Sequence, residues 1–170
     1  INANNPDELA AHISQHDLII SLLPAFMHAP VAKICVQLGK HLVTASYISD
    51  EMQALHEEAV KAGVLLLNEC GLDPGIDHLS AIKLIDEVKA QGGKINSFKS
   101  FCGGLVAPEY DDNPWNYKFS WNPRNVVVAG QATAKYLAHN ELKFIPASRI
   151  FTETEEVHSD GYGDFESYAN

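Results

Sequence analysis

The chain has 170 residues, of which 46% are hydrophobic and 20% charged, a composition typical of a soluble globular protein with a substantial core. Its formal net charge of -10 argues against nucleic acid or an anionic membrane as the main partner. No apolar stretch of the sequence approaches the length of a transmembrane helix.

Three apolar runs in the first 72 residues predict the strands of a sheet. They cover residues 17–24, 41–47 and 64–67, and each is closed by proline, glycine or polar residues. Segments with helical spacing separate them. Near-continuous apolar strands that alternate with helices indicate a parallel sheet covered on both faces, so this half belongs to the α/β class.

The two helices between these strands have recognisable ends. One is predicted to begin at Pro30, as its first residue, and to stop at Gly39, with Cys35 on its apolar face. The other is predicted to begin after the N-cap Ser49 and to run as one helix to a stop at Gly63.

Residues 68–78 (NECGLDPGIDH) follow the third predicted strand and combine carboxylates, a thiol and an imidazole with Pro and Gly. The loop lies at the carboxyl end of a strand, and that edge of a parallel sheet is where ligands bind. We therefore interpret this loop as part of a site rather than a simple connection.

The residue pattern changes in the second half, where apolar strands no longer alternate regularly with helices. We therefore expect a second, α+β domain to begin near residue 73. Asp77 is predicted to cap a helix that ends at residues 92–93, and a β-branched and aromatic segment predicts a strand over residues 94–102.

Further along the chain, the Gly, Pro and Asn residues of 103–116 predict a long loop of functional importance. A helix is predicted over residues 126–137, after Pro123. The last twenty residues, rich in acidic side chains and glycine, are interpreted as mostly loop.

Three motifs, LDPGIDH at residues 72–78, CGGL at 102–105 and YKFSW at 117–121, together resemble the saccharopine dehydrogenases of the glutamate-forming type. Residues 20–24 and 43–47 fit the same family, so the resemblance runs along essentially the whole chain. It implies that residues 1–72 are the second half of a Rossmann-type domain and residues 73–170 the start of a substrate domain. The chain is then expected to be a piece of a longer protein and inactive alone.

The resemblance implies NADP-dependent oxidation of a secondary amine to an imine in lysine metabolism, followed by hydrolysis, with a small amino-acid substrate. By family analogy Tyr47, Asp73 and Cys102 lie at the reacting carbon. Asp73 is expected to influence the amine proton, while Tyr47 and Cys102 are expected to orient the substrate or tune the charge at the site. The expected substrate contacts are Ser46, Tyr47, Asp73, Cys102 and Gly103.

Cofactor contacts are expected at the strand ends, which would flank the ribose and nicotinamide in a doubly wound domain. The residues concerned are Ile20, Ser21, Leu22, Thr44, Ala45, Leu72, Asp73 and Pro74, to which the resemblance adds Ser120. The choice of NADP comes from the family alone. No metal is expected, because His12 and His16 share helical spacing without a third ligand.

Other interpretations of the same residues remain open. An Asp before Pro-Gly is a common turn former, and a free cysteine such as Cys102 is often a buried structural residue. Related dehydrogenases that make carboxynorspermidine or homospermidine share the architecture, and a non-catalytic Rossmann-like protein would use the same edge to bind a partner. Three widely spaced cysteines favour a reducing, cytoplasmic location, and the resemblance favours a homodimer.

Overall fold

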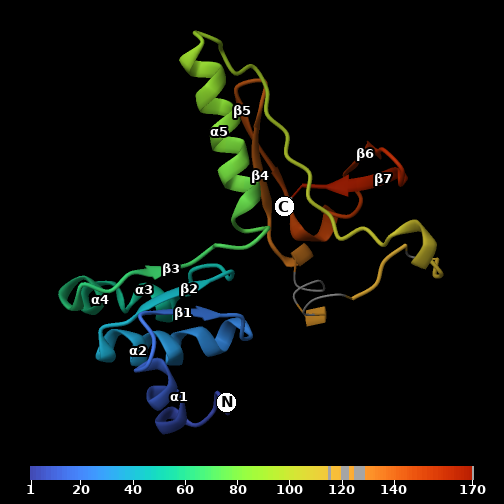
Figure 1. The fold of residues 1–170 in the computed structure, drawn as a ribbon. Helices are drawn as coiled ribbons and strands as arrows, with labels where there is room; N and C mark the ends of the chain where they lie inside the picture. The colour runs from blue at the N-terminus through green and yellow to red at the C-terminus, as the bar shows by residue number, and fades with distance from the viewer. Residues whose placement is uncertain (115, 120–122, 125–128, 170) are drawn as a thin grey trace. The chain divides into compact units, whose positions relative to one another are not determined.

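The computed structural model describes residues 1–114, 116–119, 123–124 and 129–169 (Figure 1). The chain divides into two compact units, Ile1–Ser100 and Phe101–Asn170. None of the described helices is both long enough and apolar enough to cross a membrane.

A three-stranded parallel sheet organises the first unit. Its strands are β1 (Leu18–Ser21), β2 (His41–Thr44) and β3 (Leu66–Leu67), in the order β1-β2-β3. The three predicted strands are therefore confirmed, although each is shorter than its apolar run. The register places Ser21 opposite Thr44, so the carboxyl ends of β1 and β2 lie side by side.

Four helices accompany the sheet, and local signals set their ends. Asn5 caps α1 (Pro6–Ile13) by accepting from the backbone N–H groups of Asp7 and Glu8. Helix α2 (His28–Leu38) follows the 3-10 turn η1 (Ala25–Met27) and begins two residues before Pro30, so the predicted start was late. As predicted, α2 stops at Gly39, whose φ of 66° suits glycine.

The helix predicted after Ser49 is divided in two. Ser49 caps α3 (Asp50–Gln53) by accepting from the N–H of Met52, as predicted, but α3 ends there and α4 (His56–Ala62) follows. Gly63 then closes α4 in the left-handed conformation. Met52 and Leu55 are both buried, so the chain on either side of the break still contributes to the core.

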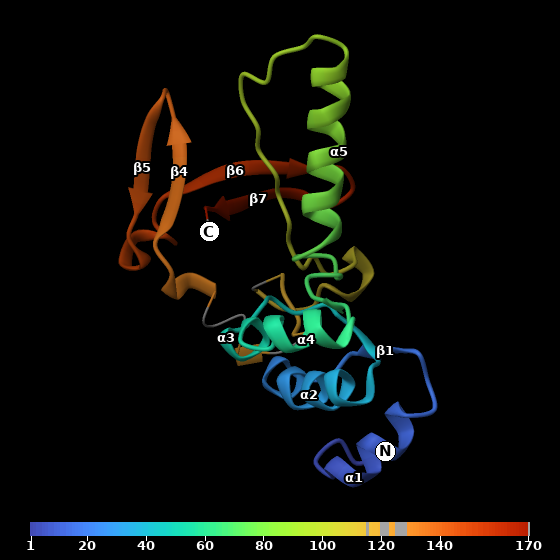
Figure 2. The same cartoon turned by 90° about the vertical axis from the view of Figure 1, so that its left-hand side faces the viewer.

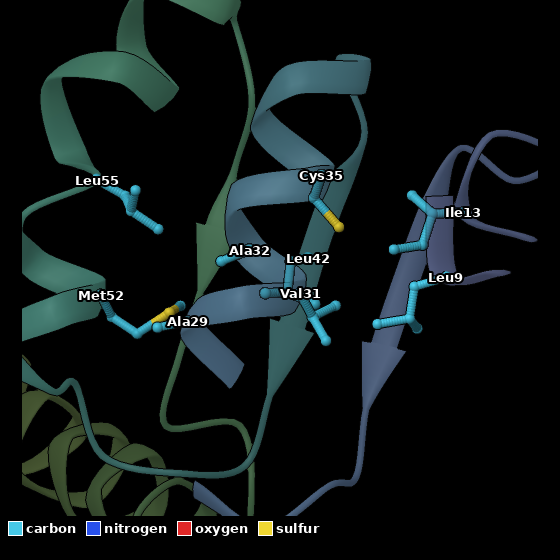
Figure 3. Packing of buried hydrophobic residues seen from close by; sticks show 9 residues of the cluster. All are labelled: Leu9, Ile13, Ala29, Val31, Ala32, Cys35, Leu42, Met52 and Leu55. Carbon is cyan, nitrogen blue, oxygen red and sulfur yellow. The ribbon is translucent and has the colours of Figure 1, made fainter. Parts of the chain in front are cut away.

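The main core lies between these helices and one face of the sheet, with α2 at its centre (Figure 3). Leu9 and Ile13 of α1 pack towards Cys35, which is fully buried as predicted, and burial raises the pKa of its thiol to about 11. Leu18 and Ile20 alternate to the opposite face and are exposed, so α1–α4 cover one face of the sheet rather than both.

Helix α5 (Ile76–Ala90) follows the loop after β3, as predicted, but its N-cap is Gly75. Asp77 lies inside the first turn, where its Oδ1 accepts from the N–H of Gly75 at 2.8 Å, so its assignment as the cap was wrong by two positions. No side chain of α5 is buried, and Leu79 is 69% exposed.

The second unit contains two antiparallel hairpins, drawn in orange and red in Figures 1 and 2. In the first, β4 (Ala134–Ala138) pairs with β5 (Glu141–Ile145) across the residues His139 and Asn140, whose φ values of 53° and 61° are those of a tight hairpin turn. In the second, β6 (Thr154–Ser159) pairs with β7 (Gly163–Tyr168). The described residues of this unit also form the 3-10 turns η2 (Pro108–Tyr110), η3 (Ala129–Gln131) and η4 (Ala147–Arg149).

These hairpins correct three predictions. Residues 94–102 form no strand. The predicted helix over 126–137 runs into strand β4, while its residues 126–128 lie outside the described part of the chain. The tail interpreted as loop is the β6–β7 hairpin, because its polar segments satisfy their backbone groups by pairing with each other. Ala134, Ile145 and Ile150 form a small core beneath them, with Tyr168 packed against it.

Candidate functional site

The loop between β3 and α5 is held against the carboxyl end of β2 by backbone contacts. The N–H of Cys70 donates to the carbonyl of Thr44 at 3.0 Å, and the N–H of Glu69 donates to that of Ser46 at 3.1 Å. A Cβ built on Gly71 would lie 3.0 Å from the Cβ of Ala45, so the loop and the strand end touch at glycine. The structure therefore places the loop at this edge of the sheet, as predicted.

The loop turns tightly before α5. The N–H of Gly71 donates to the carbonyl of Pro74 at 2.9 Å, and the N–H of Ile76 donates back to the carbonyl of Gly71 at 3.0 Å. The Asp73–Pro74 peptide bond is cis. Pro74 and Gly75 are buried, whereas Asp73 is exposed at the tip. The turn therefore presents the Asp73 carboxylate outward from a closed backbone.

Tyr47 and Asp73 meet at this edge. The Tyr47 hydroxyl donates to Oδ1 of Asp73 at 3.1 Å, although the two residues are 26 positions apart in the chain. Desolvation and the neighbouring Asp73 carboxylate raise the pKa of Tyr47, and Asp77 and Glu69 add to the effect. The phenol therefore keeps its proton at neutral pH. Tyr47 is 63% exposed, so the pair is open to a ligand.

The predicted cofactor residues at the strand ends differ in what they can offer. Ile20 and Leu22 are 66% and 83% exposed, and Leu72 is 65% exposed. Such apolar side chains fit the ribose and the ring of a dinucleotide. Ser21 and Thr44 are buried with their hydroxyls turned to His28, so only their backbone is available for a cofactor. A cavity of about 340 Å³ runs beside Ile20, Ser21 and Leu22.

His28 is the polar residue at this edge that the sequence analysis missed. It lies in the first turn of α2, is 3% exposed and forms three short side-chain contacts. Its Nδ1 lies 2.8 Å from Oγ of Ser21, and its Nε2 lies 2.8 Å from Oγ of Ser46 and 2.9 Å from Oγ1 of Thr44. One imidazole therefore joins α2 to the carboxyl ends of β1 and β2. A single histidine produces no periodic pattern in the sequence. The three hydroxyl residues at the strand ends, Ser21, Thr44 and Ser46, could have indicated that a buried polar partner binds them.

Burial also makes His28 a source of pH-dependent stability. Desolvation lowers the pKa of His28, so the native imidazole stays neutral at pH values where the unfolded chain, with a pKa of about 6.5, is protonated. The unfolded state then binds more protons, and stability falls as the pH drops below about 6.5. Between about pH 7.5 and about pH 5.5, we expect the melting temperature of the full-length His28→Gln protein to fall less than that of the wild type.

Thermal melting of both proteins across this range checks the expectation. His16→Gln is the matched control, since it removes an exposed histidine just after α1 in the same way. An equal slope for wild type and His28→Gln would show that His28 does not titrate on unfolding.

The remaining predicted residues belong to the second unit. Cys102 and Gly103 are exposed there, so their predicted place beside Tyr47 and Asp73 stays a prediction. Within the unit, the Tyr117 ring lies against Gly104, where a Cβ would come within 3.3 Å of it, and stacks edge-on with Phe119. Two of the singled-out motifs thus touch each other. Ser120 lies outside the described residues.

A parallel sheet backed by helices, with an exposed acidic loop and a phenol at its carboxyl edge, defines a Rossmann-type α/β protein. Comparison with known families makes this specific. Residues 1–67 match the model of the saccharopine dehydrogenase NADP binding domain, and residues 71–170 match that of the saccharopine dehydrogenase C-terminal domain. The chain belongs to the saccharopine dehydrogenase family.

Individual relatives agree with this assignment. The chain is 49% identical over 142 residues to the NADP, L-glutamate-forming saccharopine dehydrogenase of Schizosaccharomyces pombe, covering 84% of this chain and 32% of that protein. It is 46% identical over 151 residues to the alpha-aminoadipic semialdehyde synthase of Arabidopsis thaliana, covering 89% of this chain and 14% of the relative.

Among solved structures, apo L-Glu-forming saccharopine dehydrogenase from Saccharomyces cerevisiae superposes with a TM-score of 0.85 at 39% identity, covering 99% of this chain and 38% of that one. The chain therefore spans about a third or less of the curated relatives described here.

Proposed function

We propose that the full-length protein carrying this chain is an NADP-dependent, L-glutamate-forming saccharopine dehydrogenase of lysine metabolism. It would interconvert saccharopine, with NADP and water, and L-glutamate plus 2-aminoadipate 6-semialdehyde through an imine. The observation that carries the proposal is the Tyr47–Asp73 pair, held at 3.1 Å on the carboxyl edge of the sheet, in a chain matched over both halves by this family.

The chemistry assigns distinct tasks to these two side chains. Bound NADP supplies the hydride acceptor for the carbon beside the substrate's secondary amine. The Asp73 carboxylate is exposed and able to take the proton that the amine must lose. Tyr47, kept protonated by its raised pKa, donates to Asp73 and fixes the orientation of the carboxylate. Once that proton has passed to solvent, the same carboxylate would act as the base for the water that hydrolyses the imine.

Saccharopine-dependent reduction of NADP, followed by NADPH absorbance, tests the proposal in the full-length protein. We expect turnover with saccharopine and none with carboxynorspermidine or homospermidine. Turnover with a polyamine substrate in place of saccharopine would overturn the substrate assignment. A protein that binds NADPH but turns over none of the three substrates would overturn the proposal that it is an enzyme of this kind.

We propose further that the protein is a cytoplasmic homodimer. The dimer is supported by the family resemblance, in which the substrate domain often supplies the contact. The location is supported by the three cysteines, Cys35, Cys70 and Cys102, which are free thiols in the structure. Light scattering of the full-length protein and imaging of a tagged copy test the two statements separately.

A further inference from the structure

His28 holds a position that a purely structural core residue does not require. Its three polar contacts all go to hydroxyls at the carboxyl ends of two parallel strands, the edge at which the Rossmann architecture binds ligands. The other buried residues of α2 are apolar or small: Ala29, Val31, Ala32, Cys35 and Val36. The one buried imidazole of this helix therefore faces the site edge, whereas the labelled side chains in Figure 3 form the apolar core.

The hydrogen bonds around His28 cannot all be satisfied at once. A neutral imidazole has one donor nitrogen and one acceptor nitrogen. The Nδ1 atom is engaged by Ser21, so a single site on Nε2 is shared by the hydroxyls of Ser46 and Thr44, at 2.8 and 2.9 Å. Thr44 Oγ1 also accepts from the backbone N–H of Ser46 at 3.3 Å. The direction of the Ser46 hydroxyl thus depends on whether Nε2 is a hydrogen-bond donor or acceptor.

Ser46 is the member of this network that reaches the site. Ser21 and Thr44 are 4% and 1% exposed, whereas Ser46 is only partly buried and immediately precedes Tyr47, the partner of Asp73. The backbone of Ser46 is already fixed, since its N–H donates to Thr44 and its carbonyl accepts from Glu69. His28 therefore determines only the orientation of the Ser46 side-chain hydroxyl.

We propose that His28 is a positioning residue that fixes the Ser46 hydroxyl for contact with a polar head group of the amino-acid substrate. The inference rests on the proposed function. It assigns His28 no contact with substrate: the imidazole acts through Ser46, and its other contacts, to Ser21 and Thr44, anchor the ring between β1 and β2.

A matched pair of substitutions separates the two ring nitrogens. Asn retains a polar atom near the position of Nδ1, towards Ser21, and Gln retains one near Nε2, towards Ser46. In the full-length enzyme His28→Asn is expected to raise the KM for saccharopine about tenfold, the effect of losing roughly one hydrogen bond, with a smaller change in kcat and none in the KM for NADP. His28→Gln is expected to recover most of the loss.

A double-mutant cycle with Ser46→Ala separates positioning from general stability. If His28 acts through Ser46, His28→Asn has no further effect on KM once Ser46 is Ala. Should His28→Asn fail to fold, Ser21→Ala serves instead, because it keeps the imidazole and removes its Nδ1 anchor; it too is expected to raise KM only when Ser46 is present. Cys35→Ala, a core change on the same helix, is expected to lower the melting temperature and leave KM unchanged.

Several results would overturn the inference: equal KM values for the Asn and Gln variants, the same rise in KM with and without Ser46, or a KM that follows melting temperature across all variants. Each of these leaves wild-type turnover intact and so spares the proposed function. A wild-type enzyme without saccharopine turnover overturns the proposed function, and the inference with it.

Discussion

The Asp73→Asn variant of the full-length enzyme is expected to lose about 100- to 1,000-fold in kcat/KM for saccharopine, the range typical of a lost acid–base group. Asparagine has nearly the shape of aspartate and keeps an oxygen that accepts from the Tyr47 hydroxyl. The substitution therefore removes the proton-accepting carboxylate while leaving the 3.1 Å contact possible. The measurement is steady-state NADPH formation at several saccharopine concentrations.

The matched control is Asp17→Asn. Asp17 is an exposed carboxylate of the same unit, placed just before β1 and 3.6 Å from the Lys40 ammonium, at the amino end of the sheet. Its replacement is expected to change kcat/KM less than about twofold, because an exposed ion pair contributes little. If Asp73→Asn keeps activity within tenfold of the wild type, the proton passes through another group and Asp73 serves mainly to form the turn.

The Gly75→Ala variant is expected to destabilise the protein by at least about 2–3 kcal/mol and to abolish most turnover. A Cβ at this position would overlap the carbonyl oxygen of Gly71 and lie 2.6 Å from its nitrogen, and the φ of 148° is one that an L-residue rarely adopts. The atoms in the way are backbone, so the turn that presents Asp73 must open.

Gly63→Ala provides the comparison for this variant. Gly63 also has a positive φ, 64°, but a Cβ there meets nothing within 4 Å, so the cost is limited to about 1–2 kcal/mol of left-handed strain. Thermal melting and kcat/KM of both variants are the measurements. Equal losses for the two alanines would show that the contact between Gly75 and Gly71 is not tight in solution.

The sequence predicted where the acidic loop of the first unit lies. The run from Asn68 to His78 was placed after a strand because of its Pro and Gly residues, and the structure confirms its position at the sheet edge. The closeness of Tyr47 and Asp73 was expected from the family resemblance, and it agrees with a parallel topology, in which strands end at one edge. His28 was missed, because the expected helix start at Pro30 placed it in a loop.

What the sequence by itself determined were the features that depend on neighbours a few residues away. The Ser49 cap, the left-handed stops at Gly39 and Gly63, and the alternation of apolar strands with helices all arise from such contacts. They were sufficient to establish a parallel α/β unit with an acidic loop at its edge.

Only the tertiary structure decided the features that join distant residues. The imidazole of His28 forms a hydrogen bond with Ser46, 18 positions along the chain. The segments β4 and β6 are strands because β5 and β7 pair with them. A buried polar side chain or a strand backbone is stable only when its hydrogen-bond partners are present, and those partners are brought near by folding. Local pattern therefore could not distinguish the β4 strand from the end of a helix, or the β6–β7 hairpin from a loop.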